Sequence, residues 1–339
     1  MKISFLVTYY DQAQYVHDSL QSIFDLIVPC DFEVLVGDDG SSDGTLDLLK
    51  QWKNKYPDKL KIYEADRNDE VTDPVARVSN LRKELFRRMT GDFFCVLDGD
   101  DYYCNRNFIL TALDILRRNE VSAVLFGFQK VWKSETIEVR IQKGEGLISP
   151  DEYVKNFATH AGACVFRTIK NTDFENRLSQ SYFYDDNDIV IYQSPFGKFW
   201  YVNQCVYSYR QSENSTWNFL KRPEQGLLNV LGCDCEAIVV PEYAKELFFR
   251  YRKDILYTYF RRGNEDKYYR ENVFSEYKKM AKKIGGILSR YLFDSSNTES
   301  SDQEYMKRII SSLQTMDCTC FERIRGNVMK ELAQKIENA

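Results

Sequence analysis

The stretch FFCVLDGDDYY, residues 93–103, decides the fold. A mostly apolar, strand-like run leads directly into three carboxylates, Asp98, Asp100 and Asp101, around a single glycine. Like charges at this spacing raise one another's pKa unless a cation neutralises them. Because a hard divalent cation takes carboxylate and phosphate oxygens as ligands, a D-x-D motif after a buried strand predicts a metal site. An acidic surface turn is the alternative interpretation.

Strand and helix patterns alternate on either side of this stretch, over the first 130 residues. Apolar runs predict strands at residues 3–8, 32–39, 60–65, 92–101 and 121–128, and periodic patterns predict helices at 16–24, 41–52, 75–89 and 107–118. Such alternation is typical of βαβ units in a mostly parallel sheet covered by helices. Right-handed crossovers place the carboxyl ends of the strands along one edge, where ligands bind. The polar clusters at residues 8–10, 38–39 and 98–101 should therefore meet in one crevice.

The composition bounds the class of protein. The chain has 339 residues, of which 43% are apolar and 29% charged, so it can bury a sizeable core. Its formal net charge of −5 disfavours a general nucleic-acid binder. With only two histidines in the chain, carboxylates must carry any acid–base chemistry.

The cysteines and the amino terminus indicate a cytoplasmic protein. Nine cysteines without a repeating framework predict reduced thiols, and the C-x-C pairs Cys233/Cys235 and Cys318/Cys320 lack the spacing of zinc ligands. The first apolar run is shorter than that of a signal peptide. No stretch approaches the roughly 18 apolar residues of a membrane span.

The run DDGSSDG, residues 38–44, forms a strand-to-helix turn. It resembles the start of an EF-hand loop, but Lys50 stands where calcium needs a bidentate glutamate. Asp38 and Asp39 can instead accept a hydrogen bond from a nucleobase, while Gly40 allows the backbone to turn. The alternative is that Ser41 or Asp43 only caps the following helix, and the capping and the nucleobase contact can hold at once.

After residue 130 the pattern changes. Residues 130–142 predict a hairpin, residues 149–157 a helix capped by Ser149, and residues 162–168 a short strand. From about residue 219 onward the pattern is almost entirely helical. We therefore predict a domain boundary near residue 218.

The segments SFLVTYYDQAQYVHDSLQSI, FEVLVGDDGSSDGTLDLL and GDFFCVLDGDDYY occur in an order and at a spacing that resemble the family 2 glycosyltransferases of the GT-A fold, over about residues 1–125. The resemblance implies an α/β domain at 1–218, with a nucleotide-sugar-binding half at 1–125 and an acceptor-binding half at 126–218, followed by a helical region at 219–339. It implies an inverting enzyme that uses Mn²⁺ or Mg²⁺. Such an enzyme moves a single sugar from a nucleotide diphosphate donor, with UDP-sugars foremost, to a hydroxyl of a glycan or lipid-linked glycan.

The same resemblance implies roles for residues at three strand ends. Thr8 and Tyr10 would line the base pocket, with Tyr10 stacking on uracil. Asp39 would accept from the uracil imide. Asp100 would contact the ribose and share the metal with Asp101.

Further residues complete this expected donor site. Asp38 and Asp98 would support the nucleotide-sugar contacts. Arg77 and Asn80 lie where the family places residues that contact the diphosphate or the sugar, and Arg82 is an alternative cation.

The acidic run YDDNDIV, residues 184–190, resembles the family segment that supplies the catalytic base. Asp186 matches the aspartate that accepts the proton of the acceptor hydroxyl, and Asp185 and Asp188 remain alternatives. An inverting transfer needs such a carboxylate on the face opposite the departing diphosphate. Enrichment of acidic residues at a helix amino terminus is the other interpretation.

For residues in two loops, the sequence allows both a functional and a structural role. Arg210 and Ser215 lie where related enzymes cover the donor diphosphate, or else in an ordinary surface loop. His160 would lie in the acceptor wall, either touching the sugar or serving the structure alone.

Residues 245–292 contain 13 Lys or Arg and 6 Asp or Glu, interleaved with tyrosine and phenylalanine. This composition suits peripheral contact with an anionic inner membrane, and equally a helical appendage with a solvated basic face.

Two other functions fit parts of the pattern. One is a nucleotide-sugar- or glycan-binding subunit without turnover. The other is a phosphatase whose D-x-D supplies a nucleophile, although such motifs belong to the first strand rather than to the fourth. The absence of a Q-x-x-R-W signature favours a single addition over processive synthesis.

Overall fold

The computed structural model describes residues 1–65, 74–118, 120–181, 183–211, 222–243, 246–247 and 250–251. The chain divides into two compact units. The first comprises Met1–Tyr153, Phe157–Glu175 and Phe183–Glu213, and the second comprises Val154–Asn156, Asn176–Tyr182 and Asn214–Ala339. The boundary near residue 218 and the division at residue 125 stay predictions.

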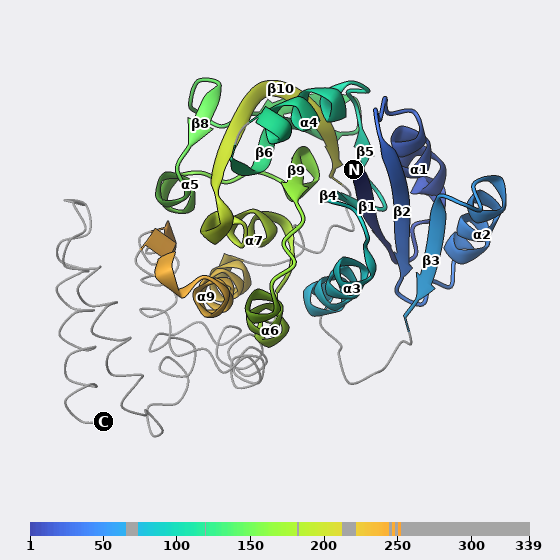
Figure 1. Cartoon of the computed structure of the whole chain (residues 1–339). Helices are drawn as coiled ribbons and strands as arrows, with labels where there is room; N and C mark the ends of the chain where they lie inside the picture. Colours follow the sequence, from blue (N-terminus) through green and yellow to red (C-terminus); the bar gives the residue numbers. More distant parts are fainter. Residues whose placement is uncertain are drawn as a thin grey trace. The chain divides into compact units, whose positions relative to one another are not determined.

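The first unit contains a mixed sheet of ten strands, most of them parallel to a neighbour (Figure 1). Its main order is β3-β2-β1-β4-β9-β6-β10-β5, with β7 beside β6 and β8 beside β10. The strands are β1 (Lys2–Tyr9), β2 (Asp31–Asp38), β3 (Leu60–Glu64), β4 (Phe93–Asp98), β5 (Tyr102–Tyr103), β6 (Val121–Trp132), β7 (Glu135–Val139), β8 (Gly146–Ile148), β9 (Cys164–Arg167) and β10 (Lys198–Arg210). The strands β3, β2, β1 and β4 run parallel, and β9 lies antiparallel between β4 and β6. The predicted mostly parallel α/β sheet is confirmed.

The helices follow the predicted alternation. The α-helices are α1 (Val16–Phe24), α2 (Thr45–Lys55), α3 (Pro74–Arg88), α4 (Phe108–Arg118), α5 (Pro150–Asn156), α6 (Thr172–Gln180), α7 (Asp186–Ile191) and α9 (Arg222–Val239), and the 3₁₀ turns are η1 (Ala13–Tyr15), η2 (Ala161–Ala163), η3 (Ser194–Phe196) and η4 (Pro241–Tyr243). The predicted cap of α5 is confirmed, because the Ser149 side chain accepts from the backbone N–H of Glu152.

Helices cover both faces of the sheet in the first unit. Along β1, Ile3, Phe5 and Val7 belong to a fully buried cluster with Leu20 of α1 and Phe108 of α4. The alternation of side chains in a strand sends the intervening residues to the opposite face. There Phe86 of α3 meets the ring of Phe94 edge-on at 5.6 Å. Burial of such side chains stabilises each by about 1.5–3 kcal/mol and fixes the register of the strands.

The register brings three strand ends to one level. Thr8 pairs with Asp98 across β1 and β4, and Tyr9 pairs with Asp38 across β1 and β2. The polar residues that follow these strands therefore lie along one edge of the sheet, as the alternation of elements predicts.

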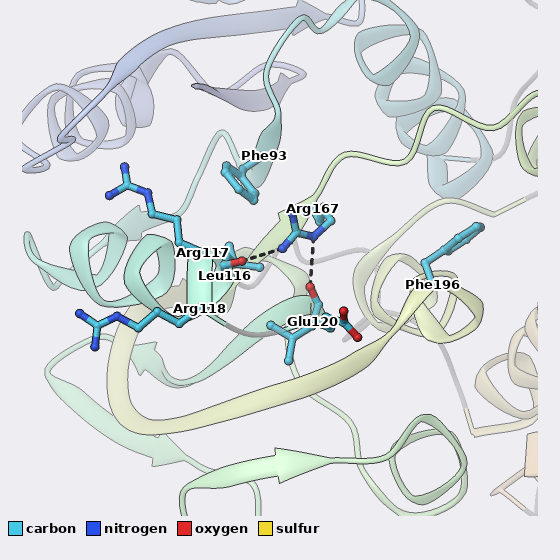
Figure 2. A pocket seen from close by; sticks show the side chains of 8 residues that line it. Phe93, Leu116, Arg117, Arg118, Glu120, Arg167 and Phe196 are labelled. Carbon is cyan, nitrogen blue, oxygen red and sulfur yellow. Dashed lines mark hydrogen bonds between the residues drawn. The ribbon is translucent and has the colours of Figure 1, made fainter.

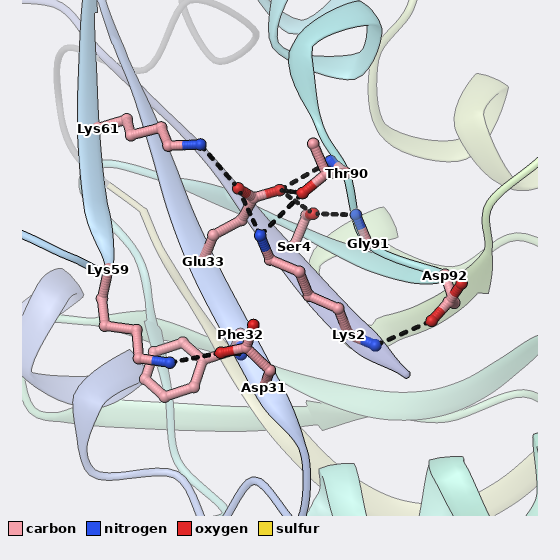
Figure 3. Close-up of polar contacts among 10 residues, drawn as sticks. All are labelled: Lys2, Ser4, Asp31, Phe32, Glu33, Lys59, Lys61, Thr90, Gly91 and Asp92. Carbon is pink, nitrogen blue, oxygen red and sulfur yellow. Dashed lines mark hydrogen bonds and ion pairs between the residues drawn. The ribbon is translucent and has the colours of Figure 1, made fainter.

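A buried carboxylate ties the strands at the opposite edge (Figure 3). Glu33 of β2 accepts from Lys2, Ser4, Lys61 and Thr90, which belong to β1, β3 and the turn before β4. Burial alone would raise the pKa of Glu33, but these donors lower it to about 2. A charged group so fully satisfied stabilises the end of the sheet.

The same edge carries a pocket of about 590 Å³, lined by Phe93, Leu116, Arg117, Arg118, Glu120, Val121, Arg167 and Phe196 (Figure 2). Arg167 donates to the carbonyl oxygens of Leu116 at 2.7 Å and Val121 at 3.2 Å. Its guanidinium lies 5.4 Å from the ring centre of Phe93. Arg167 thus caps the carboxyl end of α4 and joins it to β6, which is a structural role.

The second unit is described mainly through α9. Cys233 and Cys235 are buried in it, and neither they nor the other five described cysteines form a disulfide. Cys318 and Cys320 lie outside the described residues, as does most of the basic segment 245–292. Among the helices of the described part, none combines the length and the apolar character needed to cross a membrane.

Candidate active site

The D-x-D stretch turns sharply at the end of β4. The backbone N–H of Asp101 donates to the carbonyl of Asp98 at 2.9 Å, which closes the turn. Asp101 is completely buried and accepts from the hydroxyl of Tyr207 and, at 2.7 Å, from the backbone N–H of Arg210. Burial, followed by the charges of Asp100 and Asp98, raises the pKa of Asp101 well above its usual range, although the two hydrogen bonds act to lower it. Asp101 therefore fastens the turn to β10.

Asp100 is more open than Asp101. Its pKa is raised to about 6, first by burial and then by the negative charge of Asp98. In the described part of the chain, no side chain donates a hydrogen bond to the carboxylate of Asp100. An added cation would stabilise its charged form.

Arg82 of α3 bridges two carboxylates. One guanidinium nitrogen donates to Asp98 and another to Asp185, and the arginine side chain is only 5% exposed. Burial disfavours its charge, but Asp185 and Asp98 outweigh that effect and raise the pKa of Arg82. The end of β4 and the start of α7 are thus joined through one buried cation.

Asp186 stands at the first position of α7. Asp185 caps the helix and accepts from the backbone N–H of Asp186 at 2.9 Å. Asp186 has a φ of 34°, a left-handed conformation that is rare for a residue with a Cβ and is typical of functional positions. Its side chain is 56% exposed and lies 3.1 Å from Nε2 of His160. Desolvation first, and then Asp185 and Asp98, raise the pKa of Asp186 to about 6, while His160 and Arg82 oppose this.

Four of these residues, Arg82, Asp98, His160 and Asp186, line one narrow recess together with Val96, Ala161, Gly162 and Tyr207. Ligand atoms of Asp98, Asp101 and His160 lie within 4.8 Å of one another, close enough to surround a metal ion. The two carboxylate groups that were predicted separately, at residues 98–101 and 184–190, therefore meet.

The predicted nucleobase acceptor is held by a predicted cation. Arg77 donates to Asp39 from Nε at 2.7 Å and from Nη2 at 2.8 Å. Asp38 is turned inward and accepts from the hydroxyl and the backbone N–H of Ser41, at 2.5 and 3.0 Å. The φ of 72° at Gly40 is the turn that the sequence predicts at that glycine.

The other predicted donor contacts are less tightly grouped. Thr8 is buried at the end of β1, and Tyr10 beyond it is 42% exposed. Asn80 is exposed on α3 and makes no hydrogen bond to the other residues of the predicted donor site in the described part of the chain. All the donor-site roles remain predictions.

Arg210, at the end of β10, joins this strand to α1 and to the D-x-D turn. It donates to Asp18 at 2.7 Å and to the carbonyl of Asp100 at 2.9 Å. Its guanidinium lies 5.0 Å from the ring centre of Tyr15 and 4.6 Å from that of Tyr102. Ser215 lies outside the described residues.

The contacts of this site that were not predicted from the sequence include those of Tyr207 with Asp101 and of Asp18 with Arg210. A tyrosine in a strand and an aspartate on a helix carry no local signal. The contact of His160 with Asp186 was also unforeseen, although His160 had been singled out as one of only two histidines.

The comparisons with known proteins agree with this fold. The chain matches the model of the family described as Glycosyl transferase family 2 over residues 4–176. The crystal structure of residues 1–349 of Staphylococcus aureus TarS in complex with UDP-GlcNAc has a TM-score of 0.60 and 15% identity, covering 100% of this chain and 89% of that one. The protein therefore belongs to glycosyl transferase family 2, and its fold is GT-A.

Relatives of known sequence are matched over shorter stretches. The chain is 30% identical over 103 residues to the poly(ribitol-phosphate) beta-N-acetylglucosaminyltransferase TarS of S. aureus, covering 30% of this chain and 17% of TarS. It is 30% identical over 103 residues to the poly(ribitol-phosphate) beta-glucosyltransferase of Bacillus spizizenii, with 30% and 15% covered. An uncharacterized glycosyltransferase of Mycoplasma pneumoniae is 29% identical over 140 residues, with 41% and 44% covered. The chain thus matches less than half the length of these relatives.

Proposed function

We propose that this protein is an inverting, metal-dependent glycosyltransferase that transfers one sugar from a UDP-sugar to a hydroxyl group of a glycan or lipid-linked glycan. One observation carries the proposal: the open carboxylate of Asp186 and the D-x-D residue Asp98 line the same recess. Family membership supports the class of reaction, and the complex of TarS with UDP-GlcNAc supports a UDP-linked donor.

The donor is proposed to bind along the ends of β1, β2 and β4. Tyr10 is exposed and offers a ring face for uracil, with Thr8 beside it. Asp39 is proposed to accept from the uracil imide, in the orientation that Arg77 fixes. Asp38 supports the turn that carries Asp39.

The residues at the D-x-D turn fit a divalent cation. Asp98 and Asp100 offer carboxylate oxygens, which Mn²⁺ and Mg²⁺ accept, and an oxygen of Asp98 lies within 4.8 Å of ligand atoms of Asp101 and His160. Asp101 is also proposed to support the ion, although its oxygens already accept two hydrogen bonds. Once bound, the cation would neutralise charge on the departing diphosphate.

Asp186 is proposed as the general base. As the acceptor oxygen attacks the anomeric carbon, the carboxylate takes the hydroxyl proton, and the diphosphate leaves on the opposite face, so the configuration inverts. A pKa of about 6 leaves the group charged at neutral pH while giving it more basicity than an ordinary aspartate. Asp185 is the weaker candidate because its carboxylate is already bound to Arg82.

The test combines binding and turnover on the full chain. UDP is titrated with and without Mn²⁺ or Mg²⁺, and UDP release from UDP-GlcNAc, UDP-glucose and other UDP-sugars is measured with a panel of acceptors that includes poly(ribitol phosphate). We expect Asp186→Asn to bind UDP normally and to lose turnover by about 10²–10⁴-fold. Retained turnover in that variant would refute the base assignment. Binding without any turnover in the wild type would favour a non-catalytic subunit.

Contact with a membrane would suit a lipid-linked acceptor. The basic, aromatic segment 245–292 supports this part of the proposal through its composition alone. Co-sedimentation with vesicles containing an anionic lipid, compared with neutral vesicles, tests it.

A further inference from the structure

His160 is enclosed while its partner Asp186 is open. The exposed fraction of the side chain is 9% for His160 and 56% for Asp186. The rings of Tyr207, Tyr209 and Phe128 have their centres 4.5, 5.2 and 5.7 Å from that of the imidazole. Packing on three aromatic rings fixes the plane of the imidazole, so its nitrogens point in set directions.

The backbone decides which nitrogen of His160 can donate. Nδ1 accepts from the backbone N–H of Gly162 at 3.2 Å. In the neutral imidazole the proton is therefore on Nε2, which lies 3.1 Å from Oδ1 of Asp186. Gly162 is required for this arrangement, because a Cβ there would lie 2.2 Å from the ring of Tyr207.

The arrangement leaves one oxygen of Asp186 for chemistry. Oδ1 is the oxygen that lies 3.1 Å from Nε2 of His160, and in the described part of the chain Oδ2 has no partner. A carboxylate free to rotate about its χ angles would present Oδ2 correctly for only part of the time. A misplacement of about 1 Å at a reacting group can cost about 100-fold in rate.

We propose that His160 is a positioning residue for the base: its Nε2–H holds Oδ1 of Asp186 so that Oδ2 faces the acceptor hydroxyl. The inference rests on the proposed function, in which Asp186 takes the acceptor proton. Tyr207 extends the same support, since its ring packs on His160 and its hydroxyl donates to Asp101. The base and the D-x-D turn are thereby held through neighbouring side chains.

Two substitutions separate this role from packing. In His160→Asn the side-chain oxygen can replace Nδ1 as the acceptor for Gly162, but no donor reaches Asp186. In His160→Gln the amide nitrogen can lie near the position of Nε2 and donate. We expect kcat for UDP release in the presence of acceptor to fall about 10–100-fold in His160→Asn and less than fivefold in His160→Gln. The KM for the donor and the affinity for UDP with Mn²⁺ should change less than twofold in both.

The controls make each outcome decisive. His17→Gln changes the exposed histidine of α1 and should leave all values unchanged. In the Asp186→Asn background, His160→Asn should cost nothing further, because the group it positions is gone. Equal kcat in the Asn and Gln variants would overturn the inference, and so would loss of metal-dependent UDP binding, which would make His160 a metal ligand. Full turnover in Asp186→Asn alone would instead refute the assignment of Asp186 as the base, on which the inference rests.

Discussion

Arg77 donates two hydrogen bonds to Asp39, from Nε at 2.7 Å and from Nη2 at 2.8 Å. The pair joins α3 to the turn after β2, and the two side chains are only 12% and 14% exposed. A planar guanidinium matches the geometry of a carboxylate, so both oxygens of Asp39 are fixed in direction. The residue that is proposed to read uracil is thus oriented by the protein itself.

Replacement of Arg77 by Lys should weaken UDP binding by about tenfold, because an ammonium group cannot make the paired contact. Calorimetric titration of UDP in the presence of Mn²⁺ measures the effect. Arg87→Lys is the matched control, since Arg87 lies exposed on the same helix beside Glu84. Equal affinity in the two variants would mean that Asp39 does not depend on Arg77.

Tyr207→Phe should lower the free energy of unfolding by about 1–3 kcal/mol, because the buried carboxyl of Asp101 loses one of its two donors. Urea unfolding at neutral pH measures this. Tyr63→Phe serves as the control, as Tyr63 packs under Arg88 through its ring. A change no larger than that of the control would show that the hydroxyl of Tyr207 contributes nothing.

Asp100→Asn should reduce metal-dependent UDP affinity at least tenfold while changing the free energy of unfolding by less than about 0.5 kcal/mol. Asp100 is only partly buried and no other side chain of the described part donates to it, so the fold does not rely on its charge. Titration of UDP with and without Mn²⁺, alongside urea unfolding, measures both. If the variant binds UDP and Mn²⁺ as the wild type does, the metal contact belongs to Asp98 or Asp101.

Local patterns predicted much of this fold and the meeting of its polar clusters. The strands β1, β2 and β4 each contain a buried apolar run, and a parallel arrangement necessarily brings their carboxyl ends to one edge. Asp98 could be singled out because a carboxylate directly follows a buried strand, whereas Asp186 was singled out by the resemblance to the glycosyltransferase family. No knowledge of distant contacts was needed for those predictions.

The contacts between distant segments could not be predicted in this way. Tyr207 reaches Asp101 because β10 pairs with β5, a strand of only two residues that has no sequence signal of its own. The insertion of the antiparallel β9 between β4 and β6 is likewise a tertiary event. Which of Arg77, Asn80 and Arg82 faces the predicted donor site depends on the rotation of α3 about its axis. Packing sets this rotation, and it leaves Arg82 buried and Asn80 exposed.

The rate of transfer should fall about tenfold per pH unit below pH 6, because the general base must be charged and the pKa of Asp186 is raised to about 6. The measurement is kcat between pH 5 and 8 at saturating donor and metal. Since the pKa of Asp100 is also about 6, UDP affinity with Mn²⁺ is measured at each pH to separate loss of the base from loss of the cation. A kcat that stays level down to pH 5 would exclude Asp186 as the titrating base.

Glu33 should make the stability of the fold depend on pH. Its pKa is about 2 in the folded protein, against 4.5 for a free glutamate, because the bonds from Thr90, Lys2 and Ser4 outweigh its burial. A lowered carboxyl pKa gives stability that is fully present above pH 4.5 and is lost as the pH falls toward 2. The difference in free energy of unfolding between wild type and Glu33→Gln should shrink by about 3 kcal/mol across that window. Urea unfolding at pH 6 and pH 2.5 measures it, with Asp58→Asn, at an exposed residue in the turn before β3, as the control; an unchanged difference would place the stabilisation of this edge elsewhere.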